Sequence, residues 1–109
     1  MARILGPLSF LQAGGKVHET LDTLSTLIED RKRHPREGSY TCELLAAGDA
    51  RILKKVGEEA AEVLVAAALE DETRLLSETA DLIYHLLVML AARGLHWEDV
   101  EAELARRFK

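Results

Sequence analysis

One segment of this chain, residues 75–90, would be apolar on nearly every side if it formed a helix. Its sequence reads LLSETADLIYHLLVML. A helix with such a surface must be covered on all sides, and a chain of 109 residues offers few other helices to cover it. We therefore expect an all-α fold, a four- to five-helix bundle whose core is completed across a homodimer interface.

The remaining sequence also favours helices, because apolar residues recur at helical spacing and the alternation typical of strands is absent. Proline and glycine positions indicate where the helices end. We expect helices at about 18–33, 41–47, 49–69, 71–93 and 97–107. Ser39 or Thr41 can cap the second of these helices and Asp49 the third, whereas His96 stands where a better capping residue would be expected.

Charge and length limit the classes of partner. A net charge of −5 disfavours nucleic acid, because phosphate binding needs a basic face. Met1–Leu11 lacks the pattern of a secretory signal, and the longest apolar run, Leu82–Ala92, contains His85 and is too short to span a bilayer. We expect a cytoplasmic protein without a membrane partner, in which a weakly structured extension at 1–18 precedes one domain at 19–109.

Five carboxylates form two short clusters on the third and fourth expected helices. They are Glu58, Glu59, Glu62, Glu78 and Asp81. Residues three or four apart on a helix lie roughly 5–6 Å apart at Cβ, so the acids of each cluster can converge. A tight turn near residue 70 should make the two helices antiparallel, and Glu62 and Glu78 are each about eight positions from it. The two clusters should therefore meet.

The surroundings of these acids are apolar. On a helical wheel Glu78, Asp81 and His85 share an arc of roughly 60° that leucine and methionine flank. Buried carboxylates are costly and repel one another, and a hard divalent cation removes both penalties. Ligation by oxygen alone favours Mg²⁺ or Mn²⁺ over zinc. The lack of a Glu-x-x-His pair on these helices argues against a di-iron site.

A simpler interpretation makes these acids solvated residues or helix ion-pair partners of nearby basic side chains, which are Lys54, Lys55 and Arg74. It fits Glu58, whose wheel position drifts toward the polar side. It fits Glu78 and Asp81 less well, because His85 is the one cationic neighbour that we expect within a turn of them.

The histidine and the basic residues have structural interpretations too. A lone histidine on a buried helix, such as His85, is more often a hydrogen-bonded core residue than a ligand or a base. The run Arg31–Arg33 complements a helix C-terminus, but beside a metal site it could also bind phosphate. Of Lys54 and Lys55, one can counter the acids while the other reaches a bound polyphosphate.

Three motifs together resemble the phosphoribosyl-ATP pyrophosphohydrolase family of histidine biosynthesis. They are EGSYT at 37–41, ILKKVGEEAxE at 52–62 and ExxDLxYHLL at 78–87. The acid pattern EExxE…ExxD alone marks only the wider all-α nucleoside-triphosphate pyrophosphatase superfamily, and the other residues of the motifs are more specific. The resemblance covers about residues 19–108.

The resemblance implies Mg²⁺-dependent hydrolysis of phosphoribosyl-ATP to phosphoribosyl-AMP and pyrophosphate by a helical homodimer. It implies the metal ligands Glu59, Glu62, Glu78 and Asp81. Glu58 and Glu59 would be the catalytic residues, with Glu58 either bound to the metal through water or acting as a base for the attacking water. The candidates for contacts to the substrate are Lys32, Ser39, Tyr40, Arg51, Lys54 and Lys55. The number of metal ions stays open.

Two other functions are compatible with part of this pattern. A house-cleaning pyrophosphatase would keep the fold and the metal but act on a free or damaged nucleoside triphosphate, and the EGSYT loop argues against it. A dimeric helical interaction module whose acids bind a structural ion would show metal-dependent melting without hydrolysis.

Overall fold

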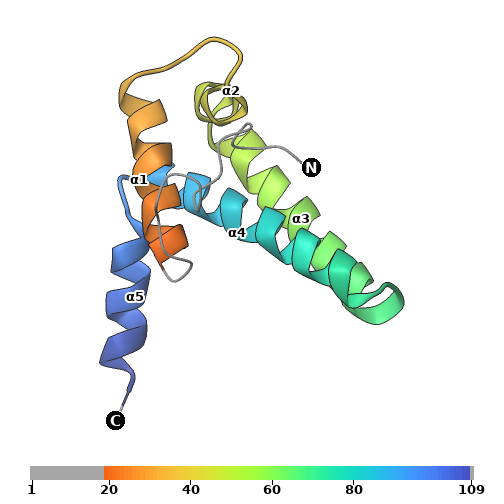
Figure 1. Cartoon of the computed structure of the whole chain (residues 1–109). Coiled ribbons are helices and arrows are strands. Elements are labelled where there is room, and N and C mark those ends of the chain that lie inside the picture. The colour runs from red at the N-terminus through yellow and green to blue at the C-terminus, as the bar shows by residue number, and fades with distance from the viewer. Residues whose placement is uncertain (1–18, 109) are drawn as a thin grey trace.

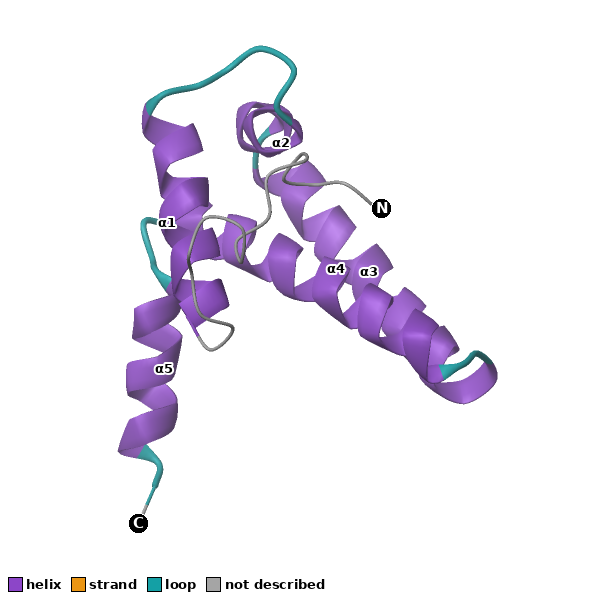
Figure 2. Cartoon of the chain, viewed as in Figure 1, coloured by secondary structure: helices purple, strands orange, loops and turns teal. Residues whose placement is uncertain are grey.

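A computed structural model describes residues 19–108 and confirms the all-α fold. Figure 2 shows only helices and loops over this range. The helices are α1 (Thr20–Arg33), α2 (Tyr40–Ala47), α3 (Asp49–Leu69), α4 (Glu72–Ala92) and α5 (Trp97–Arg106). The extension expected at 1–18 lies outside the described residues.

The helix ends follow the expected positions to within about two residues, and their caps explain the differences. Ser39 caps α2, because its Oγ accepts the N–H of Cys42 at 3.2 Å. Asp49 is the first residue of α3 rather than its cap, a position that Gly48 takes with φ +93°. After α4, the N–H groups of Gly94 and Leu95 donate to carbonyls of the last turn at 3.0 and 2.9 Å, with Gly94 at φ +74°. This is the Schellman arrangement that ends many helices at glycine.

Helices α3 and α4 form a long antiparallel hairpin, as predicted (Figure 1). The turn between them is short because Asp71 caps α4 directly, its Oδ1 accepting the N–H of Arg74 at 2.9 Å. The antiparallel pairing places the two acid clusters on facing helices.

The core lies at one end of this hairpin, where α1 packs on α4 and α2 packs on α3 and α4. Its buried side chains come from these four helices, whereas α5 contributes no buried residue. The core residues are Ile28, Leu44, Ile52, Tyr84, Leu87, Val88 and Ala91. Burying them against each other fixes the first half of α3 against the second half of α4.

The opposite end of the hairpin exposes apolar side chains. Leu64 is 71% exposed, Leu69 82% and Leu76 72%. These residues lie on both sides of the α3–α4 turn, away from the core. Completion of the bundle by a second copy of the chain stays a prediction, and this apolar end is where it would apply.

Helix α4 is long and apolar enough to cross a bilayer by length and composition. The expectation that no apolar run is long enough was therefore too strict, because it counted only Leu82–Ala92. Core helices of soluble proteins meet the same criterion, and α4 packs against α1, α2 and α3 as such a helix does. It also buries Glu78, Asp81 and His85 against these neighbours.

Candidate metal centre

Three carboxylates converge at the middle of the hairpin. Glu59 from α3 and Glu78 and Asp81 from α4 are buried, with 3%, 5% and 4% of their surfaces exposed. One potential ligand atom from each lies within 4.8 Å of the others. Glu78 and Asp81 are neighbours because they are one turn apart on α4, and the antiparallel pairing brings Glu59 opposite them.

Two of these carboxylates each keep one oxygen without a hydrogen bond. Glu59 Oε2 and Glu78 Oε2 are buried and make none to any residue between 19 and 108. A buried oxygen that lacks a partner is costly, and a charged one more so. Mg²⁺ binds carboxylate oxygens at about 2.1 Å, so small side-chain rotations would bring this group around one ion. The donor set therefore fits a hard divalent cation.

The other oxygen of each glutamate faces a cation. Lys55 Nζ lies 3.4 Å from Glu59 Oε1 and 3.8 Å from Glu58 Oε1. Arg74 Nη2 donates to Glu78 Oε1 at 2.7 Å. Partial burial lowers the pKa of Lys55, but the neighbouring Tyr40 and Glu59 outweigh it, so that this pKa is raised above its usual value. Lys55 is thus held in its charged form beside the acids.

The remaining two acids lie at the edge of the site. The side chain of Glu58 is 50% exposed, and Glu62 is exposed on α3. Glu62 and Glu78 line one cavity of about 380 Å³ together with Ala61, Val65, Glu70 and Arg74. The structure thus brings Glu59, Glu78 and Asp81 together and leaves Glu62 at the exposed edge of this cavity.

His85 is a hydrogen-bonded core residue, as the simpler interpretation holds. Its side chain is buried, and its Nδ1 lies 2.7 Å from the carbonyl oxygen of Asp81. A carbonyl only accepts, so Nδ1 carries the hydrogen, and in this tautomer Nε2 accepts from the Tyr40 hydroxyl at 3.0 Å. Burial raises the pKa of Tyr40, with Lys55 and Arg51 opposing and Glu59 and Asp81 adding to this shift. Tyr40 therefore lies close to both the acidic and the basic side chains of the site.

The other candidates for substrate contacts are distributed more widely. The Ser39 hydroxyl is engaged in capping α2. Lys32 donates to the carbonyl of Ala91 at 2.8 Å, where it satisfies the end of α4, and it lines a separate cavity of about 350 Å³. Arg51 and Lys54 are exposed on α3, on the helix that carries Glu59.

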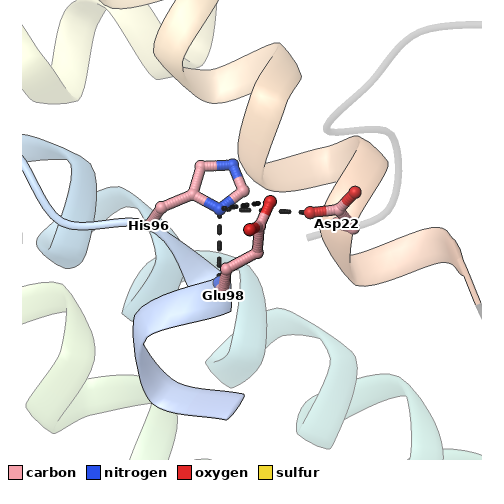
Figure 3. Close-up of side chains that lie close together, drawn as sticks. All are labelled: Asp22, His96 and Glu98. Carbon is pink, nitrogen blue, oxygen red and sulfur yellow. Dashed lines mark hydrogen bonds and ion pairs between the residues drawn. The ribbon is translucent and has the colours of Figure 1, made fainter. Parts of the chain in front are cut away.

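A second group of potential ligands, Asp22, His96 and Glu98, lies between α1 and α5 (Figure 3). Here the imidazole caps a helix: His96 Nδ1 accepts the N–H of Glu98 at 3.2 Å, and the N–H of His96 donates to Asp99 Oδ2 at 2.9 Å. The acids Asp22 and Glu98 are exposed. The expectation of poor capping at His96 was therefore wrong, because a neutral imidazole can accept as a serine does.

The simpler interpretation named Arg74 as a possible ion-pair partner of the acids, but Arg74 was not among the expected site residues. Arg74 pairs with Glu78 four residues later, whereas we expected His85 to be the sole cationic neighbour of the acids on α4. The signal was present as the i,i+4 spacing of opposite charges. Its tight contact with a buried acid makes Arg74 part of the site.

The comparisons with known proteins identify the family of this chain. Residues 21–108 match the family model described as phosphoribosyl-ATP pyrophosphohydrolase. A phosphoribosyl-ATP pyrophosphatase of Sulfurisphaera tokodaii is 54% identical over 89 residues, which are 82% of this chain and 95% of that protein. The same-named protein of Metallosphaera sedula is 50% identical over 84% of this chain and 98% of its own length. That of Streptococcus thermophilus is 53% identical over 80% of this chain and 84% of its own length.

The matched residues contain all three carboxylates of the group, the two cations beside them and the Tyr40–His85 pair. The chain belongs to the phosphoribosyl-ATP pyrophosphohydrolase family.

Proposed function

We propose that this chain hydrolyses the α–β phosphoanhydride of phosphoribosyl-ATP, releasing phosphoribosyl-AMP and pyrophosphate, as the second step of histidine biosynthesis. The names of relatives about half identical to it support this reaction. The observation that carries the proposal is the buried group of Glu59, Glu78 and Asp81, whose two orphan oxygens call for a cation. A cation aids the hydrolysis of a phosphoanhydride, because the substrate is a polyanion.

The residues of the group would hold Mg²⁺, with Glu62 completing the set from the edge of the cavity. When bound, Mg²⁺ supplies charge neutralisation on the phosphates and a coordinated water of lowered pKa. Glu59, Glu78 and Asp81 fix the position of that charge because helix packing immobilises their side chains. Fixed positions matter, since such reactions depend almost wholly on orientation and electrostatics.

The neighbouring side chains supply the remaining functions. Glu58 is half exposed, so that water can reach it. We therefore assign to Glu58 the role of the base that accepts the proton of the attacking water. Lys55 is partly buried and charged, and with the exposed Arg51 and Lys54 it offers contacts to phosphate oxygens. Tyr40 can pack against the ribose or the base. These cations come from the first turns of α3, so they would bind the phosphates on one side of the metal.

The direct test incubates the protein with phosphoribosyl-ATP and Mg²⁺ and separates the products. We expect equimolar phosphoribosyl-AMP and pyrophosphate, and no products after chelation of the metal. Release of inorganic phosphate instead would contradict cleavage between the α and β phosphates. A panel of nucleoside triphosphates serves as the control: equal rates on these would indicate a house-cleaning pyrophosphatase, and melting that depends on metal without any hydrolysis would indicate a structural ion.

We also propose that the chain works as a cytoplasmic homodimer. The apolar surface at the turn end of the hairpin, formed by Leu64, Leu69 and Leu76, supports this. Exposed apolar surfaces of this kind are unfavourable in water and are covered by association. Light scattering should therefore report about twice the chain mass of 12.1 kDa.

A further inference from the structure

We propose that Arg74 competes with the metal for Glu78, and that Glu70, which Arg74 also contacts, retains the guanidinium when the metal binds. Arg74 would then lower the affinity for the metal and Glu70 would raise it, although neither is a ligand. This inference rests on the metal site of the proposed function.

Arg74 stands between a buried acid and a more exposed one. Its Nη2 donates to Glu78 Oε1 at 2.7 Å, and its Nε donates to Glu70 Oε1 at 3.4 Å. The side chain of Glu78 is 7% exposed, that of Glu70 33% and that of Arg74 54%. The three residues share the wall of the 380 Å³ cavity with Glu62. Both contacts are present at once, so a small rotation of the guanidinium, within open space, would release Glu78 while the contact with Glu70 remains.

The two contacts differ in strength. The bond to Glu78 is short and charge-assisted, and it satisfies one oxygen of an acid that water hardly reaches. The bond to Glu70 is longer and more exposed, so that it contributes little by itself. Without a metal, the guanidinium therefore favours Glu78, where it replaces part of the missing positive charge.

A divalent cation at the three buried acids reverses this preference. Two positive charges that share one carboxylate repel each other. The metal would neutralise the charge of Glu78, whereas the charged Glu70 would still attract Arg74. Arg74 would thus move toward the mouth of the cavity, where its five N–H donors suit phosphate oxygens.

The opposite side of the site has a similar arrangement, in which one cation contacts a buried acid and a more exposed one. Lys55 contacts the buried Glu59 and the more exposed Glu58. Glu58 belongs to the proposed catalytic residues, so that changing it would alter chemistry as well as the competition. Glu70 lies outside the proposed ligands and can be changed without touching them.

The experiment measures Mn²⁺ binding by calorimetry or by electron paramagnetic resonance, without substrate. The proteins are the wild type, Arg74→Gln, Glu70→Gln and the double variant. We expect Arg74→Gln to lower the Mn²⁺ dissociation constant by about two- to fivefold, within the range for a partly exposed ion pair. Glu70→Gln should raise it, because Arg74 then has Glu78 alone. In the double variant, loss of Glu70 should have no further effect.

The double variant separates competition from a simple change in net charge. Charge effects through solvent add, so an unchanged effect of Glu70→Gln in the Arg74→Gln background would overturn the proposal. Weaker Mn²⁺ binding by Arg74→Gln would also overturn it, since Arg74 would then be orienting Glu78 for the metal. Arg106→Gln removes the same charge on α5 and should leave Mn²⁺ binding unchanged. A wild type that binds no Mn²⁺ would instead refute the metal site itself.

Discussion

The hydroxyl of Tyr40 lies 3.0 Å from Nε2 of His85, and this contact joins the first residue of α2 to the helix that carries two of the site's acids. The ring of His85 continues the connection, because its Nδ1 donates to the carbonyl of Asp81 at 2.7 Å. The rings of Tyr40 and Tyr84 each form a T-shaped pair with the imidazole, with centroid separations of 5.9 and 5.0 Å. The position of α2 is thus coupled to the backbone at Asp81.

Replacing Tyr40 with Phe should test this coupling. The change keeps the ring contacts but leaves Nε2 of the buried His85 without its donor. We expect the free energy of unfolding to fall by about 1–2 kcal/mol, the typical cost of an unsatisfied buried group. Urea unfolding of the two proteins measures it. Unchanged stability would mean that Nε2 finds another donor in solution.

Much of the fold could be predicted because it depends on local pattern. The all-round apolar surface of residues 75–90 indicated a core helix, and Gly94 indicated its end. The meeting of Glu59 with Glu78 and Asp81 also followed from the sequence, because residues at equal distances from a tight turn lie side by side in an antiparallel pair. These inferences need only helical geometry and chain connectivity.

What could not be predicted depends on how the helices pack. The Tyr40–His85 contact spans 45 residues and requires the docking of α2, which no spacing rule gives. The exposure of Glu62 depends on the rotation of α3 against α4, which side-chain packing sets. The capping role of His96 depends on a ring tautomer that the sequence does not reveal.

Gly94 and Gly57 offer a matched pair of stability predictions. A Cβ at either position would meet nothing within 4 Å, so that only backbone preferences change. Gly94 has φ +74°, and Ala there should cost about 1–2 kcal/mol. Gly57 lies within helix α3, and Ala there should stabilise the protein by about 0.4–1 kcal/mol. Thermal unfolding should show shifts of opposite sign, and destabilisation by Gly57→Ala would indicate that a second chain packs against this position.

The burial of Tyr84 should lower the free energy of unfolding at alkaline pH. Burial raises the pKa of Tyr84 to about 12 from its usual 10.0, despite the hydrogen bond with Thr41. The folded protein therefore binds this proton more tightly than the unfolded chain. The corresponding stability is complete below pH 10 and is lost as the pH rises toward 12, by on the order of 2 kcal/mol. Urea unfolding at pH 8 and 11.5 should show this loss, and Tyr84→Phe should reduce the difference between the two values.

The homodimer predicts that Leu76 is covered in solution. Leu76 is 72% exposed in the single chain, so Leu76→Glu would be harmless to a monomer. In a dimer it would bury a charge at an apolar interface, and we expect dissociation into monomers by light scattering at micromolar concentration. Phe108→Glu, at a residue that is 80% exposed near the end of α5, is the control and should leave the mass unchanged. A monomeric wild type would end the dimer proposal.

Replacing Glu59 with Gln tests the role of the buried acids themselves. The change preserves shape, removes one charge and replaces a carboxylate oxygen by a weaker ligand for Mg²⁺. Hydrolysis of phosphoribosyl-ATP should fall by several orders of magnitude, and Mn²⁺ should bind more weakly. Without metal, the free energy of unfolding should stay level or rise, because one of three mutually repelling charges is gone.

The pairing of Lys55 also supports the expectation that the free energy of unfolding does not fall. Lys55 loses a charged partner 3.4 Å away but keeps Glu58 at 3.8 Å, so that no cation is stranded. Glu101→Gln, at an exposed position on α5, removes the same charge and should change neither activity nor Mn²⁺ binding. A Glu59→Gln protein that hydrolyses normally would remove Glu59 from the site. One that loses activity by unfolding would show that Glu59 supports the fold, since an amide of the same shape would then not satisfy its buried contacts.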